Sequence, residues 1–320
     1  MIATGALVAA ALYGGLFWLL RNPVWPPAPL DAQPMASPAR LERDVRALAA
    51  IEPPRNGQNV EGLDRAADHI AQAFAASGCV PALQSFELHH TLYKNVVCSF
   101  GPSDGPRVVI GAHYDVHGDH NPGADDNASG VAGVLELARM IAATAPDLGH
   151  RIDSVAFTLE EPPYFHSAEM GSYVYARRLR EERAEVALMI AVEMIGYFSD
   201  EPGSQGFPLA PLAWFYPDKG NFIAVVGLLG DRDLVARVKE LMSLSPEMPV
   251  YSINAPRFVT GVDFSDHWSF WQQGYPAVMV TDTAFLRNPN YHRATDRPET
   301  LDYKRMAKVV EGLYRVAVGF

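Results

Sequence analysis

From residue 82 onwards, short apolar runs alternate with stretches of helical period, and this alternation limits the folds open to the chain. The predicted strands are residues 82–88, 95–100, 107–112, 152–159, 186–192, 222–228 and 277–281. The predicted helices are residues 41–51, 62–76, 127–143, 171–180, 231–242 and 300–318. Apolar strands that alternate with helices favour a mostly parallel sheet with helices on both faces. We therefore expect an α/β fold, a three-layer sandwich around a mostly parallel, mixed central sheet.

The N-terminal segment differs from the rest of the chain. Residues 2–20 carry no charged side chain, and Arg21 ends the run. A run of this length just spans a bilayer as a helix, and it lacks the basic start of a signal peptide. We expect residues 1–21 to form an uncleaved transmembrane or signal-anchor helix. The alternative, a buried core helix, is less favoured because few globular helices are apolar on all faces.

After this segment we expect a proline-rich linker over residues 22–38 and one folded domain over residues 39–320. Two long irregular stretches, 199–221 and 243–262, lie inside that domain. Loops of this length in a compact domain are usually functional or disordered. The first stretch carries four aromatic side chains, which favour a loop packed over a substrate cleft: Phe207, Trp214, Phe215 and Tyr216.

Charge and cysteine content exclude some classes of protein. The net charge is −11 and the sequence has no basic patch, so it offers no electrostatic basis for binding nucleic acid. The two cysteines, Cys79 and Cys98, form no Cys-x-x-Cys motif, which excludes a thiolate zinc site. A disulfide between them and two separate buried thiols both remain open.

Acidic and imidazole side chains follow or end several predicted strands. Ligands in open α/β sheets bind beyond the carboxyl ends of the strands, so these side chains can converge in space. Each alone is explained as a helix cap, a loop residue or a surface pair, but together they form the ligand set of a paired-metal hydrolase. The candidates are His113, Asp115, Asp125, Glu160, Glu161, Glu193 and His292.

Two patches allow a division of roles. In Gly-Ala-Asp-Asp-Asn, one of Asp125, Asp126 and Asn127 is expected to cap the following helix, which leaves another carboxylate free to turn inward. Neighbouring side chains at the end of a strand point to opposite sides. One of Glu160 and Glu161 can therefore hold a metal while the other faces a substrate water as general base.

The sequence resembles the family of zinc-dependent aminopeptidases that also includes glutamate carboxypeptidase II and glutaminyl cyclase. The resemblance covers about residues 60–303 and implies a zinc-exopeptidase-like fold. Its carriers are Gly-Ala-His113-Tyr-Asp115, Pro-Gly-Ala-Asp125-Asp-Asn-Ala-Ser-Gly-Val, Glu160-Glu161, Glu193-Met-Ile-Gly, Ser-Asp266-His267-Trp-Ser-Phe-Trp and Asn-Tyr-His292.

The resemblance implies a site with two zinc ions. The ligand roles it implies are His113 and Glu193 on one zinc, Glu161 and His292 on the other, and Asp125 bridging both. It further implies Glu160 as the general base for a zinc-activated water, Tyr291 as a hydrogen-bond donor to the tetrahedral intermediate, and Asp266 as a group behind the ligands. Asp115 is expected to orient His113. Many members have aspartate at the position of Glu193. The glutamate offers the same oxygen donors on a side chain that is longer by one methylene group.

We therefore expect a metal-dependent exopeptidase, an aminopeptidase that acts on peptides with a free N-terminus. The alternatives are a glutaminyl cyclase-like aminoacyltransferase with one zinc and a non-catalytic, receptor-like module on the same fold. For the location we expect a membrane anchor through the N-terminal helix. The positive-inside rule, applied to Arg21, Arg40 and Arg43, would keep the domain cytoplasmic. The resemblance implies an exported enzyme, and we expect an extracytoplasmic domain.

Overall fold

The computed structural model describes residues 2–25, 34–243 and 247–320. The helices are α1 (Ile2–Arg21), α2 (Pro38–Ala49), α3 (Val60–Ala76), α4 (Gly130–Thr144), α5 (Gly171–Glu181), α6 (Arg232–Met242), α7 (His267–Gln272) and α8 (Tyr303–Gly319). The strands are β1 (Ala82–Leu88), β2 (Thr91–Phe100), β3 (Arg107–His113), β4 (Arg151–Phe157), β5 (Val186–Glu193), β6 (Ile223–Leu228), β7 (Val250–Ala255) and β8 (Ala277–Thr281).

All eight strands belong to one sheet, in the order β1-β2-β4-β3-β5-β8-β6-β7. The central strands β4, β3, β5 and β8 run parallel to one another. On one side of this group β2 pairs with β4 antiparallel, and β1 pairs with β2 antiparallel. On the other side β6 pairs with β8 antiparallel, and β7 runs parallel to β6. The sheet is mixed and mostly parallel, which confirms the predicted fold class.

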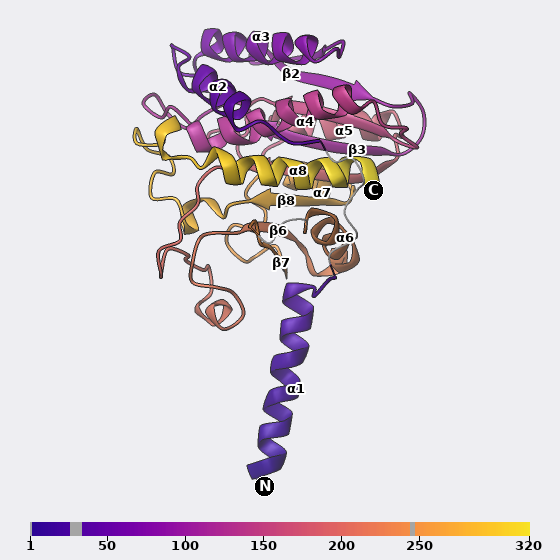
Figure 1. Cartoon of the computed structure of the whole chain (residues 1–320). Helices are drawn as coiled ribbons and strands as arrows, with labels where there is room; N and C mark the ends of the chain where they lie inside the picture. The colour runs from indigo at the N-terminus through magenta and orange to yellow at the C-terminus, as the bar shows by residue number, and fades with distance from the viewer. Residues whose placement is uncertain (1, 26–33, 244–246) are drawn as a thin grey trace.

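Helices cover both faces of the sheet (Figure 1). The apolar side chains of β3 alternate between the two faces, so both faces must be covered. On one face, Val108 and Ile110 pack in the cluster that contains residues of α2, α3, α4, α6 and α8. Val109 points to the opposite face and packs in the cluster that contains residues of α5 and α7. A strand buried on both faces reads as a continuous apolar run, which is why the central strands were predictable.

Two short elements were not predicted. Strand β7 lies within the stretch 243–262 that was expected to be irregular, of which residues 244–246 fall outside the described residues. Its sequence places Ser252 and Asn254 at buried positions, and such polar residues do not suggest a strand. Helix α7 has only six residues, which is too short for a helical period to be recognised.

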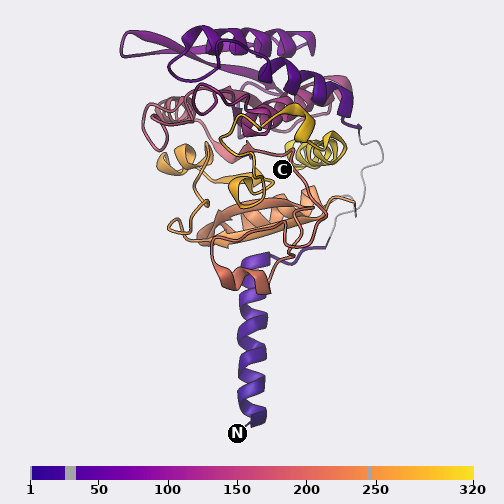
Figure 2. The ribbon, with the colours of Figure 1, turned by 90° about the vertical axis from the view of Figure 1, so that its left-hand side faces the viewer.

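The uncharged N-terminal run does form a helix, α1, which projects from the end of the molecule at which β6 and β7 lie (Figure 1, Figure 2). In the part of the chain that the structure describes, however, no helix has the length and hydropathy that a membrane crossing requires. This finding corrects the predicted transmembrane anchor and the membrane localisation built on it. The last turn of α1 is held instead by polar side chains of the folded domain, such as Asn254 and Lys239.

The predicted linker over residues 22–38 lies partly outside the described residues, which exclude 26–33. At its start, Asn22 is fully buried and hydrogen-bonded to Asn254 and Ser252. At its end, Ser37 caps α2 by accepting a hydrogen bond from the backbone N–H of Arg40. The segments on both sides of the undescribed residues therefore belong to the packed structure.

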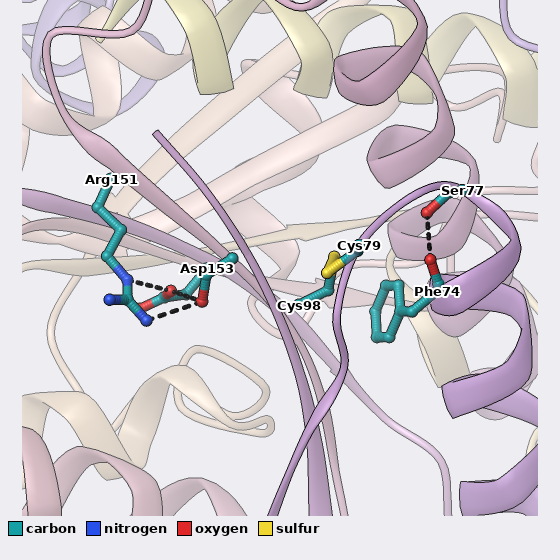
Figure 3. Close-up of a disulfide and its surroundings, with 7 residues drawn as sticks. Phe74, Ser77, Cys79, Cys98, Arg151 and Asp153 are labelled. Atoms are coloured by element: carbon teal, nitrogen blue, oxygen red, sulfur yellow. Dashed lines mark hydrogen bonds and ion pairs between the residues drawn. A yellow bond between two sulfur atoms is a disulfide. The ribbon is translucent and has the colours of Figure 1, made fainter. Parts of the chain in front are cut away.

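Cys79 and Cys98 form a disulfide with a Cα–Cα distance of 6.0 Å. It joins the segment after α3 to strand β2, and Figure 3 shows it beside Phe74 and Ser77 at the end of α3. The backbone N–H of Cys79 donates to the carbonyl of Phe74. The bond therefore attaches helix α3 to the sheet, and it decides between the two states that the sequence left open.

Reduction of this disulfide is expected to lower the free energy of unfolding by about 3 kcal/mol, because it closes a 19-residue segment of the chain. Urea denaturation with and without a reductant measures the difference. The double variant Cys79→Ala/Cys98→Ala is the control, since its curve should not respond to the reductant. Identical curves for the native chain would show that the disulfide contributes nothing to stability.

Candidate active site

The candidate site lies at the carboxyl edge of the parallel strands. His113 is the last residue of β3 and Glu193 the last of β5, while Glu160 and Glu161 follow the end of β4. Because these three strands are neighbours and parallel, their carboxyl ends lie side by side. The fold thus brings together patches that are far apart in the sequence.

Three buried side chains form a first cluster: His113, Asp126 and Glu193. The Nε2 atom of His113 lies 3.3 Å from Oδ1 of Asp126 and 3.3 Å from Oε2 of Glu193. Glu193 is held by Ser265, whose hydroxyl donates to the same Oε2 atom at 2.8 Å. The longer side chain of glutamate at this position therefore reaches the cluster and is fixed there.

A second cluster consists of Asp126, Glu161 and His292. The Nε2 atom of His292 lies 3.1 Å from Oδ2 of Asp126 and 3.3 Å from Oε1 of Glu161. Asp126 belongs to both clusters and directs one carboxylate oxygen to each histidine. The two clusters therefore share one residue, as the ligands of a bridged pair of ions do.

The shared residue is Asp126, whereas the sequence prediction assigned the bridge to Asp125. The side chain of Asp125 has other partners: its Oδ1 accepts from the backbone N–H of Gly196 at 3.0 Å, and its Oδ2 accepts from Asn288 at 2.7 Å. The physical reason is that the backbone departs from helical dihedral angles at Asp126 and Asn127, where Asn127 is held by the end of β5. This bend turns Asp126, rather than Asp125, towards the two histidines.

The expected helix cap in this turn is present and falls on Asn127. Its Oδ1 accepts hydrogen bonds from the backbone N–H groups of Gly130 and Met194, both at 3.0 Å. Its amide donates to the carbonyl of Val192 at 2.9 Å. Asn127 thus joins the turn that carries Asp126 to the end of β5, and this contact positions Asp126 beside Glu193.

Asp115 lies next to the residues of the two clusters. Its two oxygens accept from the backbone N–H groups of Glu160 and Glu161, at 3.1 and 3.0 Å. Nδ1 of His113 lies 3.2 Å from the carbonyl of Asp115 and 3.6 Å from its Oδ1. A proton on Nδ1 would be satisfied there, which leaves Nε2 as the free ligand atom. Asp115 thus contacts His113 and the backbone of both glutamates, and its orienting role stays a prediction.

Glu160 belongs to neither cluster but faces the same space. Its Oε2 lies 3.9 Å from Nε2 of His113, and its side chain is buried. Burial raises the pKa of Glu160 well above its usual range, and the neighbouring Glu161 and Glu193 raise it further, while His113 acts in the opposite direction. A carboxyl group in this environment is suited to carry a proton.

Tyr291 and Asp266 complete the predicted set. The ring of Tyr291 stacks on His292 with 3.8 Å between ring centroids, and burial raises the pKa of its hydroxyl. Asp266 is fully buried, and its carboxylate faces the buried Ser172. Burial raises the pKa of Asp266 to about 7, and His113 partly opposes this shift.

The residues of both clusters suit a metal ion. Oδ2 of Asp126 and Oε1 of Glu161 are buried and lack a hydrogen-bond partner within the described residues, although His292 lies close to both. Burial and the nearby Asp126 raise the pKa of Glu161 to about 8, a sign of unbalanced negative charge. A cation would balance this charge, and imidazole nitrogens with carboxylate oxygens are ligands that zinc accepts.

An apolar cavity adjoins the clusters. It has a volume of about 110 Å³, opens to solvent, and reaches the site at Glu193 and Tyr291. Its walls come from β6, β7, β8 and the loops around residues 205–216, 259–264 and 283–286. Of the four aromatics predicted to cover a cleft, Phe207 and Tyr216 line this cavity, whereas Trp214 is 73% exposed.

Sequence reasoning missed one buried residue that shapes the site. The guanidinium of Arg55 donates to four carbonyl groups, those of Leu48, Tyr114, Pro122 and Gly123. Three of these carbonyls belong to the segment between His113 and Asp126, so Arg55 fixes the course of the chain between two residues of the first cluster. No spacing or motif marks this arginine, because its partners are backbone atoms.

The fold is an α/β architecture with an acid-rich centre at the carboxyl edge of its parallel strands. The chain belongs to peptidase family M28, whose family model matches residues 95–317. This membership confirms the resemblance drawn from the sequence motifs, and it makes the protein a hydrolase of peptide bonds at the level of the family.

Similar proteins include an Escherichia coli protein described as uncharacterized protein YfbL, 47% identical over 285 residues that cover 87% of each chain. A probable leucine aminopeptidase of Arthroderma otae is 26% identical over 89% of this chain and 71% of its own.

Among solved structures, the LapA aminopeptidase of Legionella pneumophila has a TM-score of 0.70 at 20% identity, with 91% of this chain and 77% of that chain covered. A glutaminyl cyclase of Bacteroides thetaiotaomicron has a TM-score of 0.69 at 16% identity, with coverage of 90% and 100%. At these identities the structural matches establish the shared fold.

Proposed function

We propose that this protein is a zinc-dependent aminopeptidase with two metal ions per chain. The observation that carries the proposal is the pair of clusters that share Asp126. His113 and Glu193 would hold one ion with Asp126, and Glu161 and His292 the other. A complete set of ligands on both sides of a shared carboxylate is the arrangement that paired metal ions require.

The bound ions would polarise the scissile carbonyl and make a water molecule more acidic. In this proposal Glu160 is the general base: its carboxylate takes a proton from the water that attacks the carbonyl carbon. As the carbon–nitrogen bond breaks, the same carboxyl group gives the proton to the leaving amine. Its burial next to the clusters supports this role, because both proton transfers take place there. Tyr291 stands on the cavity side and would donate its hydroxyl hydrogen to the substrate oxygen.

The substrate we propose is a peptide with a free N-terminus and an apolar first residue. The cavity beside Glu193 and Tyr291 is lined mainly by apolar and aromatic side chains, among them Phe207, Leu212 and Phe285. Such a pocket takes an apolar side chain, while the nearby carboxylates offer partners for an α-ammonium group. The relatives named as leucine aminopeptidases agree with this preference.

Both alternatives fit the site less well. A cyclase that works with a single zinc needs only one of the two clusters, whereas here both are complete. A non-catalytic module would be expected to lack ligands or the base, but His113, Glu161 and Glu160 are all buried at the same site. The shared fold of the glutaminyl cyclases does not decide between chemistries, since one fold carries several activities.

The test combines an activity assay with a metal count on the purified full chain. We expect hydrolysis of leucyl-p-nitroanilide, loss of activity with a chelator, recovery with zinc, and two zinc ions per chain. The N-acetylated substrate is the matched control and should not be cleaved, because it lacks the free ammonium group. One zinc per chain together with cyclisation of N-terminal glutamine would contradict the proposal.

A further inference from the structure

The last turn of α1 is seated on the folded domain by a set of polar donors. The final carbonyl groups of an α-helix have no partner within the helix and must find one elsewhere. Here the amide of Asn254 donates to the carbonyl of Leu19 at 2.8 Å, and the hydroxyl of Ser252 donates to that of Arg21 at 3.0 Å. Asn254 and Ser252 are buried, so this contact is not a loose surface association.

The contact between the end of α1 and the folded domain is also electrostatically favourable. The ammonium group of Lys239, on α6, donates to the carbonyls of Arg21 and Asn22 at 2.5 and 2.9 Å. A cation is favoured at the negative end of a helix. Asn22 ends the helix with a φ of 42°, a left-handed conformation that asparagine adopts more readily than most residues. The end of α1 therefore has a defined position on β7 and α6.

Residues that contact the end of α1 also line the substrate cavity. The guanidinium of Arg21 lies over the rings of Tyr216 and Tyr251, with its carbon 5.5 and 4.6 Å from the ring centroids. Both tyrosines line the cavity, as does Ser252. The hydroxyl of Tyr216 further donates to the carbonyls of Leu20 and Ser252, at 3.3 and 2.7 Å. The far side of the cavity wall is therefore the end of α1.

A second contact ties α1 to the loop that covers the cavity. The ring of Tyr13 stacks on Phe215 with 5.0 Å between centroids, and its hydroxyl donates to the carbonyl of Trp214 at 3.0 Å. Phe215 and Trp214 directly precede Tyr216 in the chain, within the irregular segment 199–221. The helix therefore contacts this segment at two places: Tyr13 contacts Trp214 and Phe215, and the end of the helix contacts Tyr216.

We infer that the N-terminal helix supports the wall of the substrate pocket. In this inference Arg21 is a positioning residue for the side chain of the substrate. Arg21 acts through Tyr216 and Tyr251, which it holds against the cavity, and it lies outside the reacting centre. This inference rests on the proposed function, because it assigns the cavity to the first side chain of a peptide. A cation over an aromatic ring contributes a modest but measurable attraction.

The experiment compares full-length variants on leucyl-p-nitroanilide and alanyl-p-nitroanilide. Arg21→Ala is expected to raise KM for the leucyl substrate about three- to tenfold with kcat within about twofold, since it loosens binding away from the scissile bond. The alanyl substrate, with a side chain too short to fill the cavity, should change less. Arg21→Lys keeps a cation over the rings and should restore KM. Arg177→Ala removes an exposed arginine on α5 and serves as the matched control.

Limited trypsin digestion gives a readout that does not depend on activity. Lys219 lies in the segment that Tyr216 anchors, and cleavage after it should be faster in Arg21→Ala than in the native chain or Arg177→Ala. Unchanged KM together with unchanged cleavage at Lys219 would overturn the inference. If Arg21→Ala does not fold, Tyr13→Phe takes its place, because it removes only the hydroxyl that α1 donates to the carbonyl of Trp214; native values would again overturn the inference. If the native chain cleaves no peptide, the proposed function fails, and cleavage at Lys219 alone decides whether α1 holds the pocket wall.

Discussion

Replacing Glu160 by glutamine is expected to lower kcat for peptide hydrolysis by about three orders of magnitude while the metal content stays unchanged. The amide keeps the size of the side chain but cannot accept the proton of the attacking water, a step that contributes about 10²–10⁴-fold to catalysis. Metal binding should persist, because Glu160 belongs to neither ligand cluster. Steady-state kinetics and metal analysis of the same preparation measure both quantities.

The matched control is Glu181→Gln, which makes the same chemical change at an exposed position on α5, where the side chain contacts only Arg177 among the ion pairs of the described chain. It should have native activity. Two results would contradict the assignment of Glu160. Substantial activity in Glu160→Gln would mean that another group moves the proton, and loss of metal would mean that Glu160 is itself a ligand.

Asp126→Asn is expected to disturb both metal sites at once and to abolish activity. The substitution removes the charge of a side chain that faces both His113 and His292. Loss of a partner behind a ligand already costs about 10–100-fold in metal affinity, and loss of a shared ligand should cost more. Metal analysis after gel filtration should therefore find fewer than two ions per chain, with neither site retained at native affinity.

The neighbouring variant Asp125→Asn provides the sharpest control, since it makes the same change one residue away. Asp125 accepts from Gly196 and Asn288 and belongs to neither cluster. We expect it to keep both ions and to lose about 1–3 kcal/mol of stability, because the buried amide of Asn288 loses its acceptor. If Asp125→Asn loses the metals and Asp126→Asn keeps them, the bridge falls on Asp125 as the sequence prediction had it.

The pair of adjacent aspartates shows where sequence reasoning reached its limit. The motif placed a carboxylate directly before α4. Because Asp125 and Asp126 are adjacent, the motif did not distinguish which of the two faces the histidines. Which side chain turns inward depends on the dihedral angles at Asp126 and Asn127, and Asn127 is in turn held by the end of β5. A contact between segments 65 residues apart decides it, and no local pattern reports such a contact.

The edge of the sheet near α1 shows a second limit. Polar residues at alternate positions of β7, Ser252 and Asn254, did not suggest a strand. They are buried because the carbonyl groups at the end of α1 require donors, a requirement visible only when the helix is in place. The same contact explains why an uncharged N-terminal run, taken for a membrane anchor, ends on the folded domain. The pocket wall behind Tyr251 depends on it as well.

Local physical chemistry was enough to predict the central strands, the helices on both faces and the acidic and imidazole side chains at the strand ends. Apolar runs must be buried and parallel strands end at one edge, so these features follow from the order of residues alone. The tertiary structure decided which of two aspartates is shared, whether Cys79 pairs with Cys98, and what the end of α1 contacts. These outcomes depend on the distance and direction between atoms far apart in the chain, which only the packed fold defines.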